Sequence, residues 1–284
     1  MRYRLPLFLA LLCLLAAPAG AQSGTLDKIR KTGVITMGYV EGSAPFSFTD
    51  AGKQPQGYSV DLCRAIASGI RAQLKLASLE TRWVLVTIQD RLEAVKSGRV
   101  DIECSTTTWT LSRQADVDFS LVTFVDGGSI MTRSESEAGR LTDFGGKRIA
   151  VITGTTTEKV LRDTLARRSI KAEVVTVRTR AAGLQLLDQS KVDGFASDRI
   201  VLIGLVLSGK AQGTFKLLDE DFSIEPYALP LPRGDADFRL AVNRVLAGLY
   251  RTGGIEKIYN QWLGKLGPPS LLLSAAFFIQ GLAE

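Results

Sequence analysis

Along residues 33–103, segments with the apolar pattern of a strand alternate with segments whose apolar residues have helical spacing. Residues 33–40 (GVITMGYV) and 83–87 (WVLVT) are short apolar runs typical of buried strands, and a short buried strand is also expected at 100–103 (VDIE). Residues 58–70 and 90–98 instead place apolar side chains at helical spacing. Strands that alternate with helices of this length predict a mostly parallel sheet with helices on both faces.

The same alternation returns in the middle of the chain. Strands are expected at 147–153, 172–177 and 194–197, and helices at 157–168, 180–189 and 199–209. The segments LEAVKSGRVDIECS (92–105) and LQLLDQSKVDGFAS (184–197) share an apolar helical face, a small residue where the helix ends, and Val-Asp at the start of a strand. Two copies of this unit predict two similar α/β lobes, although a pattern of this length can also recur by chance.

Two apolar extended segments, 122–132 and 219–232, stand between these regions. If both cross between the lobes, the chain leaves lobe 1 near Asp126 and returns near Tyr227. Two crossover strands would form a hinge, and a hinge creates a cleft. The expected division is 22–126 plus 227–267 for lobe 1 and 132–222 for lobe 2. Helices expected at 235–253 and 254–267 would pack back on lobe 1.

The two ends of the chain are both apolar. Arg2 and Arg4, an apolar run and Ala19-Gly20-Ala21 predict a signal peptide cleaved after Ala21, with a retained anchor as the alternative. Residues 270–284 form an apolar tail too short to span a bilayer comfortably. The tail is expected to pack on the domain, and contact with a membrane surface or a partner is the alternative.

Composition narrows the function classes. The formal net charge is +6, and it falls to +4 once the two N-terminal arginines are removed, with no Lys/Arg block to favour nucleic-acid binding. The chain has no histidine, which excludes His-based triads and His-ligated zinc sites and removes the commonest general base. Cys63 and Cys104 are either one disulfide of an oxidising compartment or two buried thiols.

Hydroxyl side chains follow the strand expected at 100–103. They are Ser105, Thr106, Thr107 and Thr108. The carboxyl ends of strands in open α/β sheets are the usual place for ligands. Arg113 lies close enough to offer its planar fork of donors to a carboxylate beside these hydroxyls. The alternative is a surface arginine paired with Asp116 or Asp118.

Arg91 and a group of threonines in the second lobe also suit ligand binding. Arg91 opens a helix, where its charge opposes the helix dipole and a bound anion would relieve the mismatch. In the second lobe a strand and glycine lead into Thr155, Thr156 and Thr157. These threonines form either an anion site or a cap, with Thr155 or Thr156 as N-cap and Glu158 in the first turn.

Asp198 follows the strand expected at 194–197, and it suits either a ligand ammonium group or the N-cap of the next helix. Together these residues match a zwitterion, with its carboxylate on Arg113 and its ammonium on Asp198. No nucleophile stands beside a base, so no catalytic residue is expected.

At this point the chain resembles the periplasmic amino-acid-binding proteins of ABC importers, solute-binding protein family 3, and in particular the glutamate/aspartate branch. The motifs that carry the resemblance are APFSF (44–48), GYSVDLCRAI (57–66), DRLEAVKSGRVDIECSTTTWTLSRQADVDFS (90–120), GTTTEKVL (154–161) and FASD (195–198). The resemblance covers the chain from the predicted cleavage site to about residue 267. It implies an α/β, two-lobe periplasmic binding protein fold with two crossover strands forming a hinge.

The resemblance also implies roles for individual residues. Arg113, assisted by Thr106 and Thr108, would clamp the ligand α-carboxylate. Asp198 would bind the α-ammonium group, Thr155, Thr156 and Thr157 would supply contacts from the second lobe, and Arg91 would lie near a side-chain carboxylate. Two positions depart from the pattern: Val40 stands where the acidic-amino-acid branch has a further arginine, and Ser43 where binders of cationic amino acids stack an aromatic ring.

We therefore expect an exported, monomeric substrate-binding protein that captures an acidic or small polar L-amino acid and delivers it to an ABC permease in the inner membrane. No cofactor, metal or nucleic acid is expected. One alternative is a periplasmic cyclohexadienyl dehydratase-like enzyme on the same fold, for which Glu41 is the nearest candidate general acid. A ligand-sensing domain of a receptor is the other.

Overall fold

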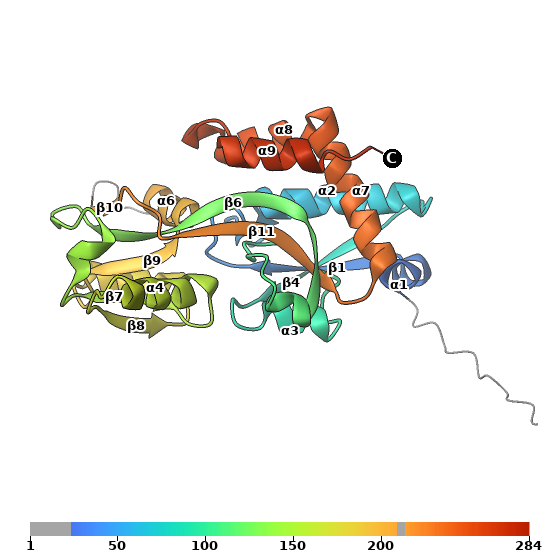
Figure 1. The fold of residues 1–284 in the computed structure, drawn as a ribbon. Helices are drawn as coiled ribbons and strands as arrows, with labels where there is room; N and C mark the ends of the chain where they lie inside the picture. The colour runs from blue at the N-terminus through green and yellow to red at the C-terminus, as the bar shows by residue number, and fades with distance from the viewer. Residues whose placement is uncertain (1–23, 209–213, 284) are drawn as a thin grey trace, which may run out of the picture.

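Each half of the molecule is built on its own sheet. In the computed structural model, which describes residues 24–208 and 214–283, a three-stranded parallel sheet has the order β4-β1-β5, and a six-stranded sheet has the order β10-β6-β9-β7-β8 with β11 beside β6 (Figure 1). The predicted signal peptide lies outside the described residues. The α/β fold with two lobes is confirmed. The residue ranges given above for lobe 1 and lobe 2 stay a prediction, and we keep these names for the two halves.

Most strands occur where the apolar runs predict them. Those of lobe 1 are β1 (Val34–Val40), β4 (Glu80–Val86) and β5 (Ile102–Glu103), with a small hairpin of β2 (Phe48–Thr49) and β3 (Pro55–Gln56). Those of the second sheet are β6 (Val117–Arg133), β7 (Arg148–Ile152), β8 (Glu173–Val177), β9 (Gly194–Asp198), β10 (Phe215–Leu217) and β11 (Ser223–Pro232). Strands β2, β3 and β10 were not expected, and β5 is shorter than predicted.

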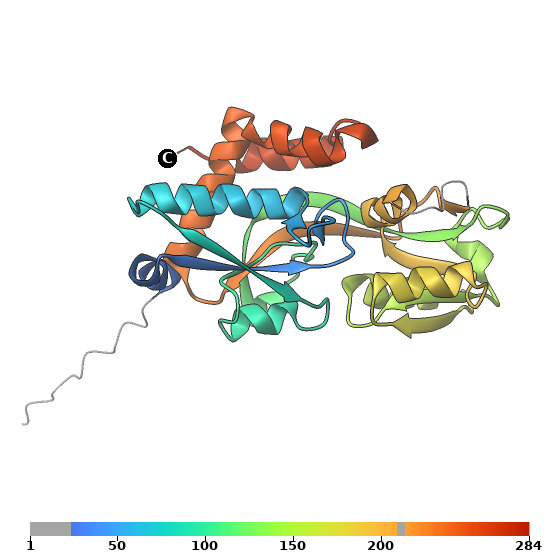
Figure 2. The same ribbon diagram turned by 180° about the vertical axis from the view of Figure 1, so that it is seen from behind.

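The helices also follow the predicted pattern, except that the first of them, at the start of the described residues, was not expected. In lobe 1 and the C-terminal region they are α1 (Thr25–Thr32), α2 (Tyr58–Gln73), α3 (Arg91–Lys96), α7 (Ala236–Thr252), α8 (Gly254–Leu263) and α9 (Leu271–Gln280). In lobe 2 they are α4 (Thr156–Arg167), α5 (Arg180–Asp188) and α6 (Arg199–Ser208). The apolar tail therefore forms a helix, α9, which lies with α8 on the outer side of α2 and α7 (Figures 1 and 2).

Strand β7 shows why the strands of lobe 2 are continuous apolar runs in the sequence, with no alternation of apolar and polar residues. Successive side chains of a strand point to opposite faces of its sheet. On one face Ile149 and Val151 pack with Leu161 of α4, and on the other Ile152 packs with Leu187 of α5. Because helices cover both faces, the polar positions of an exposed strand are replaced by apolar ones.

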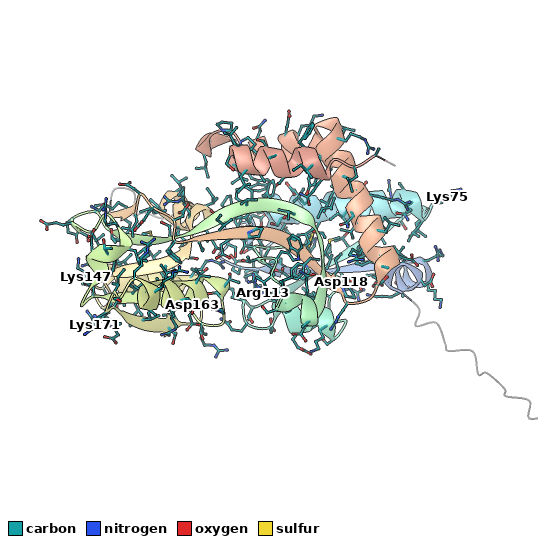
Figure 3. All side chains as sticks on the ribbon, in the orientation of Figure 1. Lys75, Arg113, Asp118, Lys147, Asp163 and Lys171 are labelled. Atoms are coloured by element: carbon teal, nitrogen blue, oxygen red, sulfur yellow. A yellow bond between two sulfur atoms is a disulfide. The ribbon has the colours of Figure 1, made fainter. Side chains whose placement is uncertain are left out.

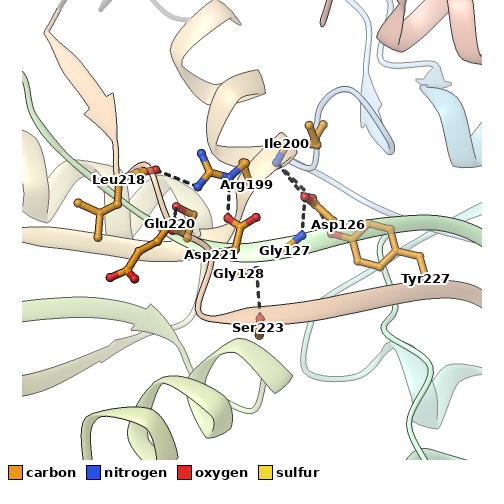
Figure 4. Close-up of polar contacts among 11 residues, drawn as sticks. Asp126, Gly127, Gly128, Arg199, Ile200, Leu218, Glu220, Asp221, Ser223 and Tyr227 are labelled. Atoms are coloured by element: carbon orange, nitrogen blue, oxygen red, sulfur yellow. Dashed lines mark hydrogen bonds and ion pairs between the residues drawn. The ribbon is translucent and has the colours of Figure 1, made fainter. Parts of the chain in front are cut away.

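The two lobes are joined by β6 and β11, which pair antiparallel and run side by side between them (Figures 1 and 2). Asp126 of β6 accepts hydrogen bonds from the amides of Gly127 (2.8 Å) and Ile200 (3.2 Å), and the Gly128 amide donates to Ser223 Oγ (3.0 Å), as Figure 4 shows. The Ile200 amide lies in the first turn of α6, where backbone N–H groups lack helical partners. The hinge therefore caps a helix of lobe 2 directly.

One disulfide, Cys63–Cys104, joins helix α2 to the residue that follows β5, with 6.2 Å between the Cα atoms. Of the two alternatives considered for these cysteines, a disulfide or two buried thiols, the structure has the disulfide. The bond holds the end of β5 where the hydroxyl run begins.

Replacing both cysteines (Cys63→Ala with Cys104→Ala) should lower the free energy of unfolding by about 4 kcal/mol, because the bond closes a loop with a sequence separation of 41 residues. Urea unfolding of the two proteins measures the difference. The oxidised and reduced wild type should differ by a similar amount, and a loss below about 1 kcal/mol would contradict the predicted stabilisation.

Candidate ligand-binding cleft

A narrow cleft lies between the lobes, and both contribute to its walls. Its lining residues are Ile88, Arg91, Thr106, Thr108, Ile152, Thr155, Thr156, Thr157, Arg180, Ala196, Ser197 and Asp198. Several of them come just after strands or at the starts of helices. Seven of the eight site residues predicted from the sequence are in this set, and Arg113 is the exception.

Alternate residues of the hydroxyl run after β5 make different contacts. Ser105 and Thr107 donate their hydroxyls to the buried carboxylate of Glu103, the latter at 2.7 Å. Thr106 and Thr108 alternate with them and line the cleft. Glu103 thus satisfies one set of hydroxyls, whereas the other set faces the cleft, where Thr106 accepts from Arg180 and Thr108 donates to Glu225.

Arg113 adjoins the cleft through Thr108, to whose carbonyl its Nη1 donates at 2.7 Å. The surface pairing considered above is wrong, because Asp116 pairs with Lys96 and Asp118 lies 3.8 Å from Arg239. Figure 3 places Arg113 in the middle of the molecule. Burial, and then the positive charge of Arg91, lower the pKa of Arg113 to about 10. A bound carboxylate would compensate both effects.

Arg91 is the first residue of α3, as expected, and it is buried. Its Nη1 lies 3.5 Å from Ser105 Oγ, at the edge of hydrogen-bonding distance. A buried guanidinium at a helix N-terminus is stabilised by neither water nor the dipole. The position therefore favours an anion in the cleft.

The three threonines of lobe 2 divide their roles. Thr155 is the N-cap of α4 and accepts from the Glu158 amide at 3.1 Å, which confirms the expected cap. Thr156 donates to Glu225 at 2.8 Å, and Thr157 donates to Asp198 at 3.1 Å. These threonines therefore supply the cap of α4 and also line the cleft.

Asp198 is the last residue of β9 and is buried in the cleft wall. The alternative role for it was to cap the following helix. The Ile200 amide of that helix donates to Asp126 of the hinge instead. Asp198 is therefore available to face a ligand cation.

Arg180 is a cleft residue that sequence reasoning missed. It is the first residue of α5 in lobe 2, and it is buried. Its Nη1 donates to Ser43 Oγ at 2.8 Å and its Nη2 to Thr106 Oγ1 at 3.3 Å, so it bridges from lobe 2 to lobe 1. Its Nε has no hydrogen-bond partner in the described part of the chain. Arg91 holds the equivalent place at the start of α3, and this repeated arginine was the signal in the sequence.

Glu225 of β11 is the second residue that was missed. Its Oε2 accepts from Thr108 Oγ1 of lobe 1 at 2.7 Å and from Thr156 Oγ1 of lobe 2 at 2.8 Å. Its Oε1 accepts from Ser223 at 2.8 Å. Burial and then the charge of Asp198 raise the pKa of Glu225. A single hinge carboxylate thus links hydroxyls of both lobes at the closed cleft.

The three arginines of the cleft lack close carboxylate partners in the described part of the chain, although Asp198 and Glu225 lie in the same region. Within residues 24–208 and 214–283, no carboxylate lies within 4.0 Å of the guanidinium groups of Arg91, Arg113 or Arg180. Burial lowers the pKa of Arg180, an effect that Asp198 opposes and Arg91 adds to. The described residues also contain no cluster of three or more His, Cys, Asp or Glu that could hold a metal. The arrangement suits an organic anion that also carries one cation.

Comparison with known proteins agrees with this geometry. Residues 35–265 match the family described as bacterial extracellular solute-binding proteins, family 3. The chain is 33% identical over 260 residues to the L-glutamate/L-aspartate-binding protein of Pseudomonas aeruginosa, covering 90% of this chain and 86% of that one. It is 28% identical over 257 residues to the glutamate/aspartate import solute-binding protein of Escherichia coli, covering 90% and 84%.

A solved structure with the same fold is that of the ancestral amino-acid-binding protein AncCDT-1, a precursor of cyclohexadienyl dehydratase. The TM-score is 0.72 and the sequence identity 25%, over 84% of this chain and 99% of the other. The fold is thus that of two-lobe amino-acid-binding proteins.

Closure also depends on a glycine. A Cβ placed on Gly204 of α6 would lie 2.2 Å from the carbonyl oxygen of Ala44 in lobe 1. Such a distance lies well inside van der Waals contact, so only glycine permits this approach of the two lobes.

Gly204→Ala should therefore weaken ligand binding about tenfold or more, in line with an overpacking cost of about 1–3 kcal/mol that falls on the closed state. Isothermal titration calorimetry with the ligand proposed below measures the effect. Gly248→Ala on α7 is the matched control, because a Cβ there meets nothing within 4 Å. A lowered melting temperature with unchanged affinity would show that the contact is present in the open form as well.

Proposed function

The chain belongs to family 3 of the bacterial extracellular solute-binding proteins, and on this basis we propose that it captures glutamate or aspartate between its lobes for an ABC importer. The observation that carries the choice of ligand is the trio of arginines without carboxylate partners, set opposite Asp198. A neutral amino acid would satisfy one arginine and leave two buried cations uncompensated. An acidic amino acid brings a second carboxylate.

Each ligand group has a proposed partner. The α-carboxylate lies between Arg113 and the hydroxyls of Thr106 and Thr108, where a planar fork favours bidentate binding. The α-ammonium group lies against Asp198, and the threonines of the α4 N-terminus close the site from lobe 2. The positive end of that helix adds to the attraction for an anion.

The side-chain carboxylate lies between Arg91 and Arg180. Val40 stands where the resemblance implies another arginine, and it is buried among apolar side chains that include Val86. Arg180 supplies the second cation from the opposite lobe instead. Ser43, which accepts from Arg180, leaves no aromatic platform for a cationic side chain. Both departures from the family pattern are therefore consistent with an acidic ligand.

The setting of this activity is proposed with it. We propose export to the periplasm with cleavage after Ala21, action as a monomer, and delivery of the ligand to a permease in the inner membrane. Proteins of this kind bind and release their ligand without chemical change. Glu41, the candidate acid for a dehydratase, is exposed, accepts a weak bond from the Thr49 amide, and does not line the cleft. Its position favours binding over dehydration.

The direct test is a thermal-shift screen of the ligand-stripped protein against the twenty amino acids and prephenate. A ligand at about 100 times its dissociation constant adds about 2.7 kcal/mol of stability and raises the melting temperature. Glutamate and aspartate should give the largest shifts. A response to neutral amino acids alone, or turnover of prephenate, would overturn the proposal.

Arg180→Met should weaken glutamate binding by at least about 30-fold, because removing one partner of a buried charge pair costs 2 kcal/mol or more. Binding of glutamine should change much less, since its side chain is uncharged. Calorimetry with both ligands measures the discrimination. Arg178→Met, two residues away and exposed, is the matched control and should leave both affinities unchanged. Equal losses for the two ligands would contradict a side-chain contact.

Ligand affinity should also depend on pH through Glu225. Its pKa is raised by burial and by Asp198, and an ammonium group beside Asp198 would lower that pKa again, so binding releases a proton. Affinity should be constant at high pH and should fall as pH drops through the raised pKa of Glu225, above the usual value of about 4.3. Titrations between pH 4 and 8 measure the curve, and Glu225→Gln should flatten its upper part. An identical curve for wild type and variant would exclude Glu225 as the source.

A further inference from the structure

Helix α9 has an outer face more apolar than the surface of a soluble protein requires. Its exposed large side chains are Leu271, Leu272, Phe278 and Ile279, and Leu282 follows just beyond the helix. Leu271 and Phe278 are 91% and 88% exposed. Single exposed apolar residues are ordinary, but a contiguous group indicates an interaction site. We call these five residues the α9 face.

The α9 face is fixed in its outward direction. On the opposite side of the helix Leu273 and Phe277 are buried, and the Phe277 ring stacks on Tyr250 with 4.8 Å between centroids. Gln280 accepts from the Val122 amide at 2.7 Å, and Ser270 caps the helix by accepting from the Leu273 amide at 3.2 Å. Because the helix is capped and docked on β6 and α7, it cannot rotate to bury its outer face.

Within the described residues one cation stands at each end of the α9 face, and in the sequence Glu284 follows Ala283. Residues 266–283 contain no Asp, Glu, Lys or Arg. Lys265 precedes the helix, and Arg251, which donates to the carbonyl of Leu282, stands at its other end. Both are exposed, and neither forms an ion pair with any carboxylate in the described residues. An occupant of this surface should be apolar where it meets the helix and anionic at the rim.

A second copy of the chain fits that description poorly. A two-fold dimer through the α9 face places equivalent surfaces against each other. With the helices antiparallel, Arg251 of one copy would meet Lys265 of the other, and with them parallel each cation would meet its own equivalent. Either arrangement brings like charges together, which opposes association.

An anionic lipid surface fits both features. A helix with an apolar face and basic flanks lies in the interface with its apolar side chains among the acyl chains and its cations at the headgroups. The apolar area also continues beyond the helix, because Leu272 lines a groove behind the hinge together with Phe222, Ile224 and Leu266. No helix in the described residues is long and apolar enough to cross a membrane, so α9 would lie on the bilayer rather than span it.

We infer that α9 is a membrane-surface helix that holds the protein reversibly on an anionic lipid bilayer through the α9 face, with Lys265 and Arg251 at the headgroups. The helix lies on the same side as α8, outside the layer of α2 and α7 (Figures 1 and 2), and none of its residues lines the ligand cleft. Lipid contact therefore leaves the binding site accessible.

The test is co-sedimentation of the purified exported protein with vesicles of phosphatidylglycerol and phosphatidylethanolamine, and with vesicles of phosphatidylcholine alone. The wild type should sediment with the anionic vesicles, less with the neutral ones, and less as salt is raised. The double variant Phe278→Ser with Ile279→Ser should lose at least about tenfold in vesicle affinity. Leu85→Ser with Leu240→Ser, also exposed apolar side chains but outside α9, is the matched control and should bind as the wild type does.

The charge contribution is tested separately. Lys265→Glu should weaken binding to anionic vesicles only, whereas Lys171→Glu in lobe 2, an exposed lysine labelled in Figure 3, should not. All variants should keep the melting temperature and amino-acid affinity of the wild type, which separates this inference from the proposed function. Absence of vesicle binding by the wild type would overturn it. So would equal vesicle binding by the Phe278/Ile279 variant, or a dimer in analytical ultracentrifugation that this variant dissociates.

Discussion

The pairing of β6 with β11 is the constraint on which the rest of the structure depends. These strands belong to segments far apart in the sequence, and their antiparallel ladder is the framework that connects the two sheets. The same ladder carries Asp126, which caps α6, and Glu225, which meets hydroxyls from both lobes. Strand pairing, helix capping and the cleft contacts are thus centred on one two-stranded ribbon, and a change in its register would move all three.

Electrostatics explains why the closed cleft is poised for an anion. Arg91 and Arg180 are buried and Arg113 is partly buried, and their neutral partners are hydroxyls and a carbonyl. Neutral hydrogen bonds satisfy part of each guanidinium but do not cancel its charge. The carboxylate of Glu225 is a second imbalance, because burial disfavours its charged form. An amino acid with two carboxylates and one ammonium group is complementary to both imbalances.

Local patterns predicted most of the fold and much of the site, because the relevant signals were contiguous in sequence. Apolar runs and helical spacing gave the strands and helices, and the hydroxyl run after β5 gave Thr106 and Thr108. Arg180 was missed because its contacts with Ser43 and Thr106 come from distant parts of the chain. Glu225 was missed for the same reason, since an acidic residue in an apolar extended segment has no local partner that reveals its role.

The route of the chain through its two sheets also sets an order of assembly. Strands β6 to β11 come from one continuous stretch, whereas helix α2, which packs on the sheet of β1, β4 and β5, is itself covered by α7 and α8 from the far end of the chain. Buried residues such as Ile35 and Met37 share a cluster with Val242 and Leu246 of α7. This core therefore cannot be completed until the last helices of the chain are available. The first strands of lobe 1 thus depend for their packing on the part of the polypeptide that is synthesised last.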